Sequence, residues 1–274
     1  MPMSTTVSLP RLVDALLPAV VAAGRIQMQY FQQSPEVETK KNNTPVTVAD
    51  RLSEEFILKA LAAAAGNIPV IAEESAALGS IPQIGEEFFL VDPLDGTRDY
   101  IAGRPDFTVN IGLIAKGQPV FGLIYAPARE ALFMTDPATG AAMAGSLSLH
   151  DSAVRCEMLG LRRIHARRVP GRALTVATSQ SHPSAAVEDF LKCQDVGERL
   201  RMGSSIKFCL IAEGRADLYP RFKDTCEWDT AAGQAILEAA GGSVVDTAGA
   251  SLTYGHSERS FINPHFIAWG ERAA

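Results

Sequence analysis

The stretch Asp92-Pro-Leu-Asp-Gly-Thr97 directly follows the short apolar run Phe88-Phe-Leu-Val91. Such a run is typical of a buried strand, so the carboxylates stand at the end of a rigid element, where ligands bind in layered α/β proteins. Pro93 keeps Asp92 out of the helical region, and Gly96 lets the backbone approach a ligand. Carboxylates this close face one point only when a cation neutralises them, and Mg²⁺ prefers oxygen ligands. Taken alone, the stretch indicates a site for a cation such as Mg²⁺, and a capped turn is the competing interpretation.

Two further acidic clusters stand beside apolar runs. Glu73-Glu74 ends the run Pro69 to Ala72, and Asp229 precedes a helix predicted over Thr230 to Ala240. Taken alone, the first is typical of a solvated strand end and the second of a helix N-cap. Finding all three clusters in one chain favours a common site.

The first half of the chain predicts a pair of helices followed by a mostly antiparallel sheet. One helix is expected over Leu12 to Phe31, and a second after Thr47, where Asp50 has the spacing of a capping-box partner. Strands are expected over these segments, with a hairpin turn at 116–118: 69–72, 88–91, 107–114, 120–125 and 131–134.

The second half alternates strands and helices, which is typical of an α/β arrangement. The expected order is a strand at 173–178, helices at 184–192 and 204–213, a strand at 216–219, and the helix at 230–240. A basic, irregular segment precedes it, so we predict an N-terminal α+β subdomain over 1–165 and a C-terminal α/β subdomain over 166–274. The first would carry most of the metal ligands, and the second Asp229 and the residues that set substrate specificity.

Composition narrows the classes of function. The chain has 274 residues, of which 47% are hydrophobic, enough for a large core, and a formal net charge of -6. An acidic surface argues against binding a nucleic acid polymer, which depends on neutralising phosphates. No segment has the length and hydropathy of a membrane span, and the start lacks the pattern of a signal peptide. We therefore expect a cytoplasmic protein, with peripheral attachment to the inner membrane left open.

The three clusters together resemble the signatures of the inositol monophosphatase superfamily of lithium-sensitive, magnesium-dependent phosphatases. They stand here as Glu73-Glu74-Ser75, Asp92-Pro-Leu-Asp-Gly-Thr97 and Trp228-Asp229-Thr-Ala-Ala232. The resemblance implies a five-layer α/β/α/β/α sandwich of the inositol monophosphatase/fructose-1,6-bisphosphatase type. It also implies a homodimer, the usual assembly in the wider family.

A narrower resemblance is to the CysQ branch, whose members are 3′(2′),5′-bisphosphate nucleotidases. It is carried by four stretches, over residues 91–97, 107–111, 203–214 and 218–222. It implies hydrolysis of 3′-phosphoadenosine 5′-phosphate to AMP and phosphate, in nucleotide recycling during sulfur assimilation. The segment Ser179-Gln-Ser-His182 departs from the branch because Gln180 replaces an arginine, which puts one substrate contact in doubt.

The resemblance also implies roles for individual residues. Two or three Mg²⁺ ions would be held by Glu73, Asp92, Asp95, Asp229 and the carbonyl of Leu94. Thr97 and Asp50 would orient the attacking water, together with Glu73. The phosphate end of the substrate would contact Leu94, Asp95, Gly96, Thr97 and Asp229.

A bisphosphate needs a second anion site, for which Lys and Arg are suited. The candidates for the nucleotide end are Ser204, Lys207 and Arg221, and His182 could stack on or hydrogen-bond the adenosine. The competing interpretation is that Lys207 and Arg221 are surface charges and that His182 is an ordinary loop histidine.

The same candidate residues are compatible with other functions. The nearest is an inositol-1-phosphatase or a fructose-bisphosphatase on the same scaffold, and a more distant one is a non-catalytic anion- or nucleotide-binding protein. The chain lacks the G-x-S-x-G, Walker A and H-E-x-x-H motifs of other hydrolases and nucleotide-binding proteins. Hydrolysis by a metal-activated water, with no protein nucleophile, is the mechanism that we predict.

Overall fold

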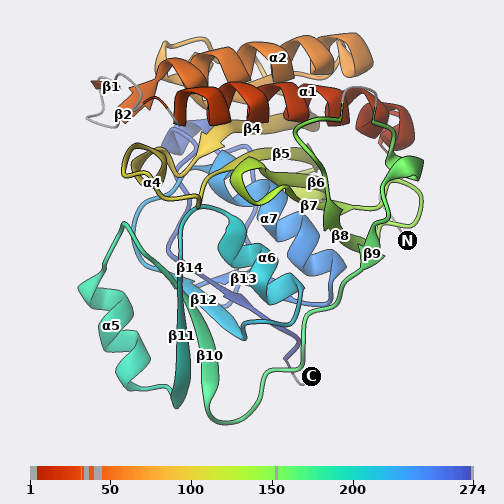
Figure 1. The fold of residues 1–274 in the computed structure, drawn as a ribbon. Helices are drawn as coiled ribbons and strands as arrows, with labels where there is room; N and C mark the ends of the chain where they lie inside the picture. The colour runs from red at the N-terminus through yellow and green to blue at the C-terminus, as the bar shows by residue number, and fades with distance from the viewer. Residues whose placement is uncertain (1–4, 32, 34–36, 40–44, 152–153, 273–274) are drawn as a thin grey trace.

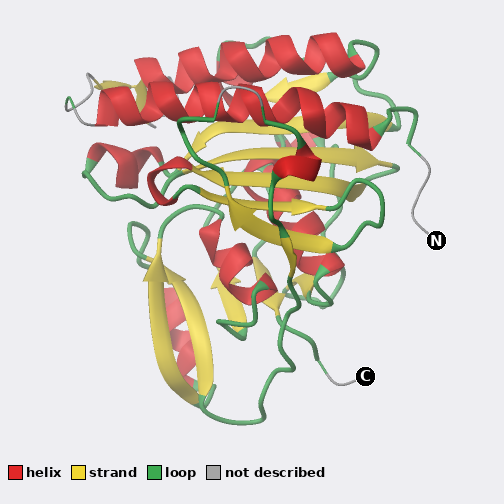
Figure 2. Ribbon diagram, turned by 45° about the vertical axis from the view of Figure 1, so that its right-hand side comes forward, coloured by secondary structure: helices red, strands yellow, loops and turns green. Residues whose placement is uncertain are grey.

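The computed structural model describes residues 5–31, 33, 37–39, 45–151 and 154–272. Two long helices lie along one side of a seven-stranded sheet, and a second sheet lies on its far side (Figures 1 and 2). No helix among the described residues is long and apolar enough to cross a membrane.

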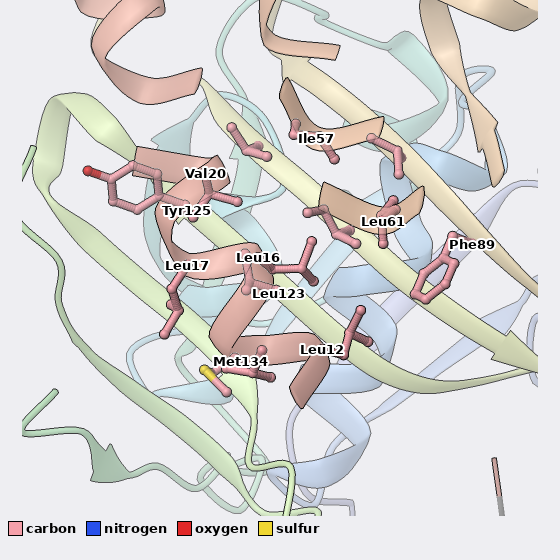
Figure 3. Packing of buried hydrophobic residues seen from close by; sticks show 14 of the residues in the cluster. Leu12, Leu16, Leu17, Val20, Ile57, Leu61, Phe89, Leu123, Tyr125 and Met134 are labelled. Atoms are coloured by element: carbon pink, nitrogen blue, oxygen red, sulfur yellow. The ribbon is translucent and has the colours of Figure 1, made fainter. Parts of the chain in front are cut away.

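The helix pair is α1 (Leu9–Phe31) and α2 (Val48–Ala65), close to the bounds expected from the apolar pattern. The buried face of α1 includes Leu12, Leu16 and Val20, and α2 adds Ile57 and Leu61. Figure 3 shows these side chains packed over the sheet, against residues such as Phe89 and Leu123. Burial of this apolar face is what holds the helix pair on the sheet.

The seven-stranded sheet keeps its strands in chain order, with β3 and β4 parallel and the other neighbours antiparallel. The strands are β3 (Val70–Ala72), β4 (Glu87–Asp95), β5 (Thr108–Ala115), β6 (Gln118–Ala126), β7 (Ala131–Thr135), β8 (Ala142–Ser146) and β9 (Arg162–Arg163). The predicted hairpin turn at 116–118 joins β5 to β6. Small elements flank the sheet: β1 (Val37–Thr39), β2 (Pro45–Thr47), α3 (Glu73–Ala77) and α4 (Thr97–Ile101).

The second sheet has the strand order β11-β10-β12-β14-β13. Its strands are β10 (Leu174–Ser179), β11 (Val196–Met202), β12 (Leu218–Arg221), β13 (Ser243–Asp246) and β14 (Phe266–Trp269). The sequence pattern predicts β10 and β12 only. The missed β11 and β13 are edge strands without a clear apolar alternation, β11 because its charged side chains are mostly exposed. β14 was also missed, although buried and half-buried side chains alternate along it.

Three more helices complete the layers: α5 (Ala185–Lys192), α6 (Ile206–Ala212) and α7 (Glu227–Ala239). α6 and α7 lie between the two sheets, and α5 covers the outer face of the second sheet (Figure 1). The succession of helix pair, sheet, helix pair, sheet and helix confirms the expected five-layer α/β/α/β/α sandwich. The boundary at 165/166 falls between β9 and β10, but α7 packs on the first sheet, and the two subdomains stay a prediction.

Two helix starts differ from those expected. α6 begins at Ile206 rather than Ser204, and α7 begins at Glu227 rather than Thr230. Cys226, which propensity does not favour as a cap, is the N-cap of α7. Asp229 is therefore not the N-cap but the third residue of the helix, where its carboxylate accepts a hydrogen bond from the Cys226 N–H at 2.7 Å.

α7 approaches the first sheet very closely because both surfaces are built from small residues. A Cβ on Gly112 of β5 would lie 2.8 Å from the Ala231 Cβ, and one on Gly122 of β6 would lie 2.3 Å from the Ala232 carbonyl oxygen. The glycines therefore set how near the first turn of α7, with Asp229, comes to the end of β4.

The variant Gly122→Ala tests this spacing. The added methyl group would overlap the backbone of α7, so we expect a loss of stability of about 1–3 kcal/mol, measured by urea unfolding. Gly85→Ala is the matched control, because a Cβ at this exposed position meets no atom within 4 Å. Equal stability of the two variants would contradict the argument.

Candidate metal and phosphate site

Three carboxylates from distant parts of the chain meet at one end of the first sheet. Glu73 begins α3 directly after β3, Asp92 lies near the end of β4, and Asp229 lies in the first turn of α7. Each offers an oxygen atom, and these atoms lie within 4.8 Å of one another. The structure thus brings together the three acidic clusters of the sequence.

We expected the D-x-x-D-G stretch to form a turn after a strand. In the structure it is instead the bulged end of the strand itself. β4 continues to Asp95, and its register slips between Asp92, which pairs with Asn110, and Asp95, which pairs with Thr108. The chain advances three residues along β4 but only two along β5 between these pairs, so β4 carries one extra residue, as in a β-bulge. Gly96 follows at a φ of 94°, and a Cβ there would lie 2.7 Å from the Asp106 carbonyl oxygen. The strand end and the left-handed glycine aim the two carboxylates.

Asp95 is held by two groups that the sequence reasoning did not single out. Its Oδ2 accepts hydrogen bonds from the Ser205 N–H at 2.6 Å and from Asn110 Nδ2 at 3.2 Å. The Ser205 hydroxyl in turn donates to Asn110 Oδ1 at 2.7 Å. Both residues lie within stretches that carry the family resemblance, which was the available signal. The second sheet's loops thus help to orient a carboxylate of the first sheet.

Asp50 makes hydrogen bonds that fit both of the interpretations left open by the sequence. Its Oδ2 accepts from the Thr47 N–H at 2.8 Å and from the Thr47 hydroxyl at 2.6 Å, which caps α2. Its Oδ1 lies 3.2 Å from Thr97 Oγ1, which is also 3.2 Å from the Leu94 carbonyl oxygen. Asp50 is buried behind Thr97 and therefore acts on the site through that hydroxyl.

A cavity of about 670 Å³ opens above these groups. Apart from Asp50, each predicted site residue lines it: Glu73, Asp92, Leu94, Asp95, Gly96, Thr97, His182, Ser204, Lys207, Arg221 and Asp229. The cavity is large enough for a nucleotide, since ligand pockets commonly measure about 300–1,000 Å³.

The cationic candidates are not surface charges. Lys207 is 3% exposed, and its Nζ donates to the Ser204 carbonyl oxygen at 2.5 Å and lies 4.9 Å above the Tyr219 ring. Burial lowers the pKa of Lys207 to about 8. Arg221 is half-buried, and its buried Nε has no hydrogen-bond partner among the described residues. Lys207 therefore shapes the loop, while Arg221 has a donor to offer a ligand.

His182 also lines the cavity, close enough to Arg221 for that charge to affect its pKa. Burial, followed by the nearby charges of Arg221 and Arg98, lowers the pKa of His182 to about 4. Its ring is therefore neutral near pH 7, which suits stacking on a base. Gln180, by contrast, is exposed and is not among the residues that line the cavity.

Arg98 is a further cavity residue that the sequence reasoning missed. It comes directly after Thr97, is exposed, and lines the cavity close enough to His182 to affect its pKa. A cation directly after the D-G-T segment was the signal that could have found it.

The acidic cluster is electrostatically costly without a cation. Burial, together with the negative charges of Asp95 and Glu73, raises the pKa of Asp229 to about 8. Burial also raises the pKa of Asp95. Carboxylates forced together in this way are stabilised by a bound cation, and hard divalent cations take such oxygen ligands. The donor set fits a metal ion.

A comparison with protein families agrees with this geometry. The profile of the inositol monophosphatase family matches residues 10–270. The chain belongs to the inositol monophosphatase family. This family is metal-dependent, which agrees with the acidic cluster at the end of β4.

Individual relatives point to one branch. The 3′(2′),5′-bisphosphate nucleotidase CysQ of Buchnera aphidicola is 37% identical over 262 residues, which cover 94% of this chain and 93% of the relative. CysQ of Escherichia coli K12 is 37% identical over 246 residues, which cover 89% and 94% of the two chains. The crystal structure of CysQ from Bacteroides thetaiotaomicron matches with a TM-score of 0.75 and 33% identity, over 94% of this chain and 97% of that one.

The raised pKa of Asp229 predicts a pH dependence of the metal-free protein. An unfolded aspartate has a pKa of about 4, so between pH 4 and 8 the folded chain binds the proton more tightly. Stability should therefore fall as the pH rises from 6 to 8, by at most about 1.4 kcal/mol per pH unit for one proton. Urea unfolding in chelator measures it.

The variant Asp229→Asn supplies the control for this pH effect. It removes the titrating carboxylate, so the fall in stability between pH 6 and pH 8 should become smaller. A fall of the same size in both proteins would assign the effect to other groups.

Proposed function

We propose that this chain is a Mg²⁺-dependent phosphomonoesterase that hydrolyses 3′(2′)-phosphoadenosine 5′-phosphate to AMP and phosphate. The observation that carries the proposal is one cavity that is lined both by the carboxylate cluster and by Arg221, Lys207 and His182. The nucleotidase names of the relatives at 37% identity support the choice of substrate.

Two or three Mg²⁺ ions would be held by the cluster. The ligands would be the carboxylates of Glu73, Asp92, Asp95 and Asp229, with the carbonyl of Leu94. Bound Mg²⁺ would supply charge neutralisation of the phosphate, a lowered pKa of water and stabilisation of the leaving oxygen.

Residues of the chain would position the attacking water and the phosphate. Thr97 has a single hydroxyl proton, and Asp50 and the Leu94 carbonyl both accept it, so its lone pairs are left to receive a hydrogen bond from water. Glu73, at the start of α3, would position the same water from the other side. The backbone of Gly96 and Thr97 would contact the phosphate.

The nucleotide would extend toward the second sheet. The neutral ring of His182 fits stacking on or hydrogen bonding to adenine, and the unpaired Nε–H of Arg221 fits a second phosphate. Ser204 and Lys207 would define the loop between them. The product AMP would return to nucleotide recycling during sulfur assimilation; a cytoplasmic location and a homodimer stay predictions.

A phosphate-release panel with Mg²⁺ distinguishes the substrates. We expect 3′-phosphoadenosine 5′-phosphate to exceed inositol 1-phosphate and fructose 1,6-bisphosphate in kcat/KM by roughly tenfold or more, which is about 1.4 kcal/mol, because only the nucleotide offers both a second phosphate to Arg221 and a base to His182. A tenfold preference for inositol 1-phosphate would instead favour the inositol monophosphatase alternative.

The variant Asp95→Asn separates an enzyme from a non-catalytic binding protein. Loss of a metal ligand should lower kcat on the order of 10²–10³-fold, since the metal contributes several kcal/mol to the transition state. The control is Asp189→Asn on the outer helix α5, whose side chain is 70% exposed. An active, folded Asp95→Asn enzyme would refute the metal site.

A further inference from the structure

Two buried carboxylates lie at the junction between the metal-binding end of the first sheet and the loops of the second. Asp99 belongs to α4, two residues after Thr97, and is 2% exposed. Asp106 lies just before β5 and is 5% exposed. Buried charges are unfavourable unless they are paired, and both of these have partners from the other side of the junction.

Asp99 fixes the loop that carries His182. Its Oδ1 accepts hydrogen bonds from the Ser181 hydroxyl and from Arg104 Nε, both at 2.5 Å. The Nη2 of Arg104 also donates to the Ser181 hydroxyl oxygen, at 2.5 Å. The three groups form a closed triangle, so the residue next to His182 is tied to the helix that follows the phosphate-binding stretch.

Asp106 fixes the loop that carries Ser204. Its Oδ1 accepts from Arg129 Nη2 at 2.5 Å, and its Oδ2 accepts from the Gly203 N–H at 3.2 Å. A Cβ on Gly203 would lie 2.7 Å from both Asp106 Cβ and Asp99 Oδ2. The loop is therefore packed directly on the two carboxylates.

The same loop holds a strained residue. Ser204 has a φ of 47°, a left-handed conformation that an L-residue adopts only when its surroundings hold it. The bond to Gly203 on one side and the bond from Lys207 Nζ to the Ser204 carbonyl on the other supply that hold. The conformation of the nucleotide side of the cavity thus depends on the junction.

We propose that Asp99 is a positioning residue that determines the preference for a bisphosphorylated nucleotide. It acts through Ser181 and sets where the loop that carries His182 stands relative to the carboxylate cluster. Asp106 has a wider effect, because the loop that it fixes at Gly203 also holds Asp95 through the Ser205 N–H. A small phosphomonoester does not reach His182 and is indifferent to the loop that Asp99 fixes. This inference rests on the proposed nucleotidase function.

The test uses Asp99→Asn and Ser181→Ala in the full chain, with Asp106→Asn as a contrast that should impair both substrates, because its loop also holds Asp95. KM and kcat are measured with Mg²⁺ for 3′-phosphoadenosine 5′-phosphate and for glycerol 2-phosphate, which has no nucleoside. In Asp99→Asn and Ser181→Ala we expect KM for the nucleotide to rise roughly tenfold, as for the loss of a charge-assisted hydrogen bond. In these two variants kcat for the nucleotide, and kcat/KM for glycerol 2-phosphate, should change by less than about threefold.

Ser181→Ala keeps the test valid if the aspartate variants fail to fold, because it leaves Asp99 paired with Arg104. Asp189→Asn is again the exposed control. In Asp99→Asn and Ser181→Ala, an unchanged KM for the nucleotide, or an equal loss on both substrates, would overturn the inference and leave the proposed function standing. A native chain without preference for the nucleotide would overturn both.

Discussion

The repulsion between carboxylates held at one point is the constraint on which this site depends. Glu73, Asp92 and Asp229 come from three separate elements, and their oxygen atoms approach within 4.8 Å of one another. Ions of like charge do not gather in this way unless the scaffold holds them and a cation neutralises them. Burial, followed by the negative charges of Asp95 and Glu73, raises the pKa of Asp229 in the metal-free chain.

Small residues between α7 and the first sheet allow the scaffold to hold these carboxylates close together. Gly112 and Gly122 let α7 lie directly against the first sheet, and Gly233 does the same between α7 and Phe208 of α6. Ordinary side chains at these places would push α7 outward and move Asp229 away from β4. Ala231 and Ala232, which face these glycines, therefore help to set the geometry of the carboxylate cluster.

The sequence alone was sufficient for the elements with a clear apolar period and for the three acidic clusters. It was not sufficient where a tertiary contact decides the outcome. The polar edge strand β11 exists because β10 pairs with it, and α7 begins at Glu227 because Cys226 and Asp229 bond to each other. Ser205 and Asn110 could not be assigned to Asp95 because they are 110 and 15 residues away from it along the chain.

Asp50 shows why a structural and a functional interpretation of one residue need not exclude each other. A carboxylate has two oxygen atoms, and here one caps α2 while the other holds the Thr97 hydroxyl. The cap fixes the carboxylate at no loss to the site, and a fixed acceptor orients a hydroxyl better than a mobile one. Glu54, one turn further along α2, uses its oxygens in the same way: they accept from the N–H groups of Glu74 and Ser75 and thereby fix α3 behind Glu73. A single helix thus supports both ends of the carboxylate cluster.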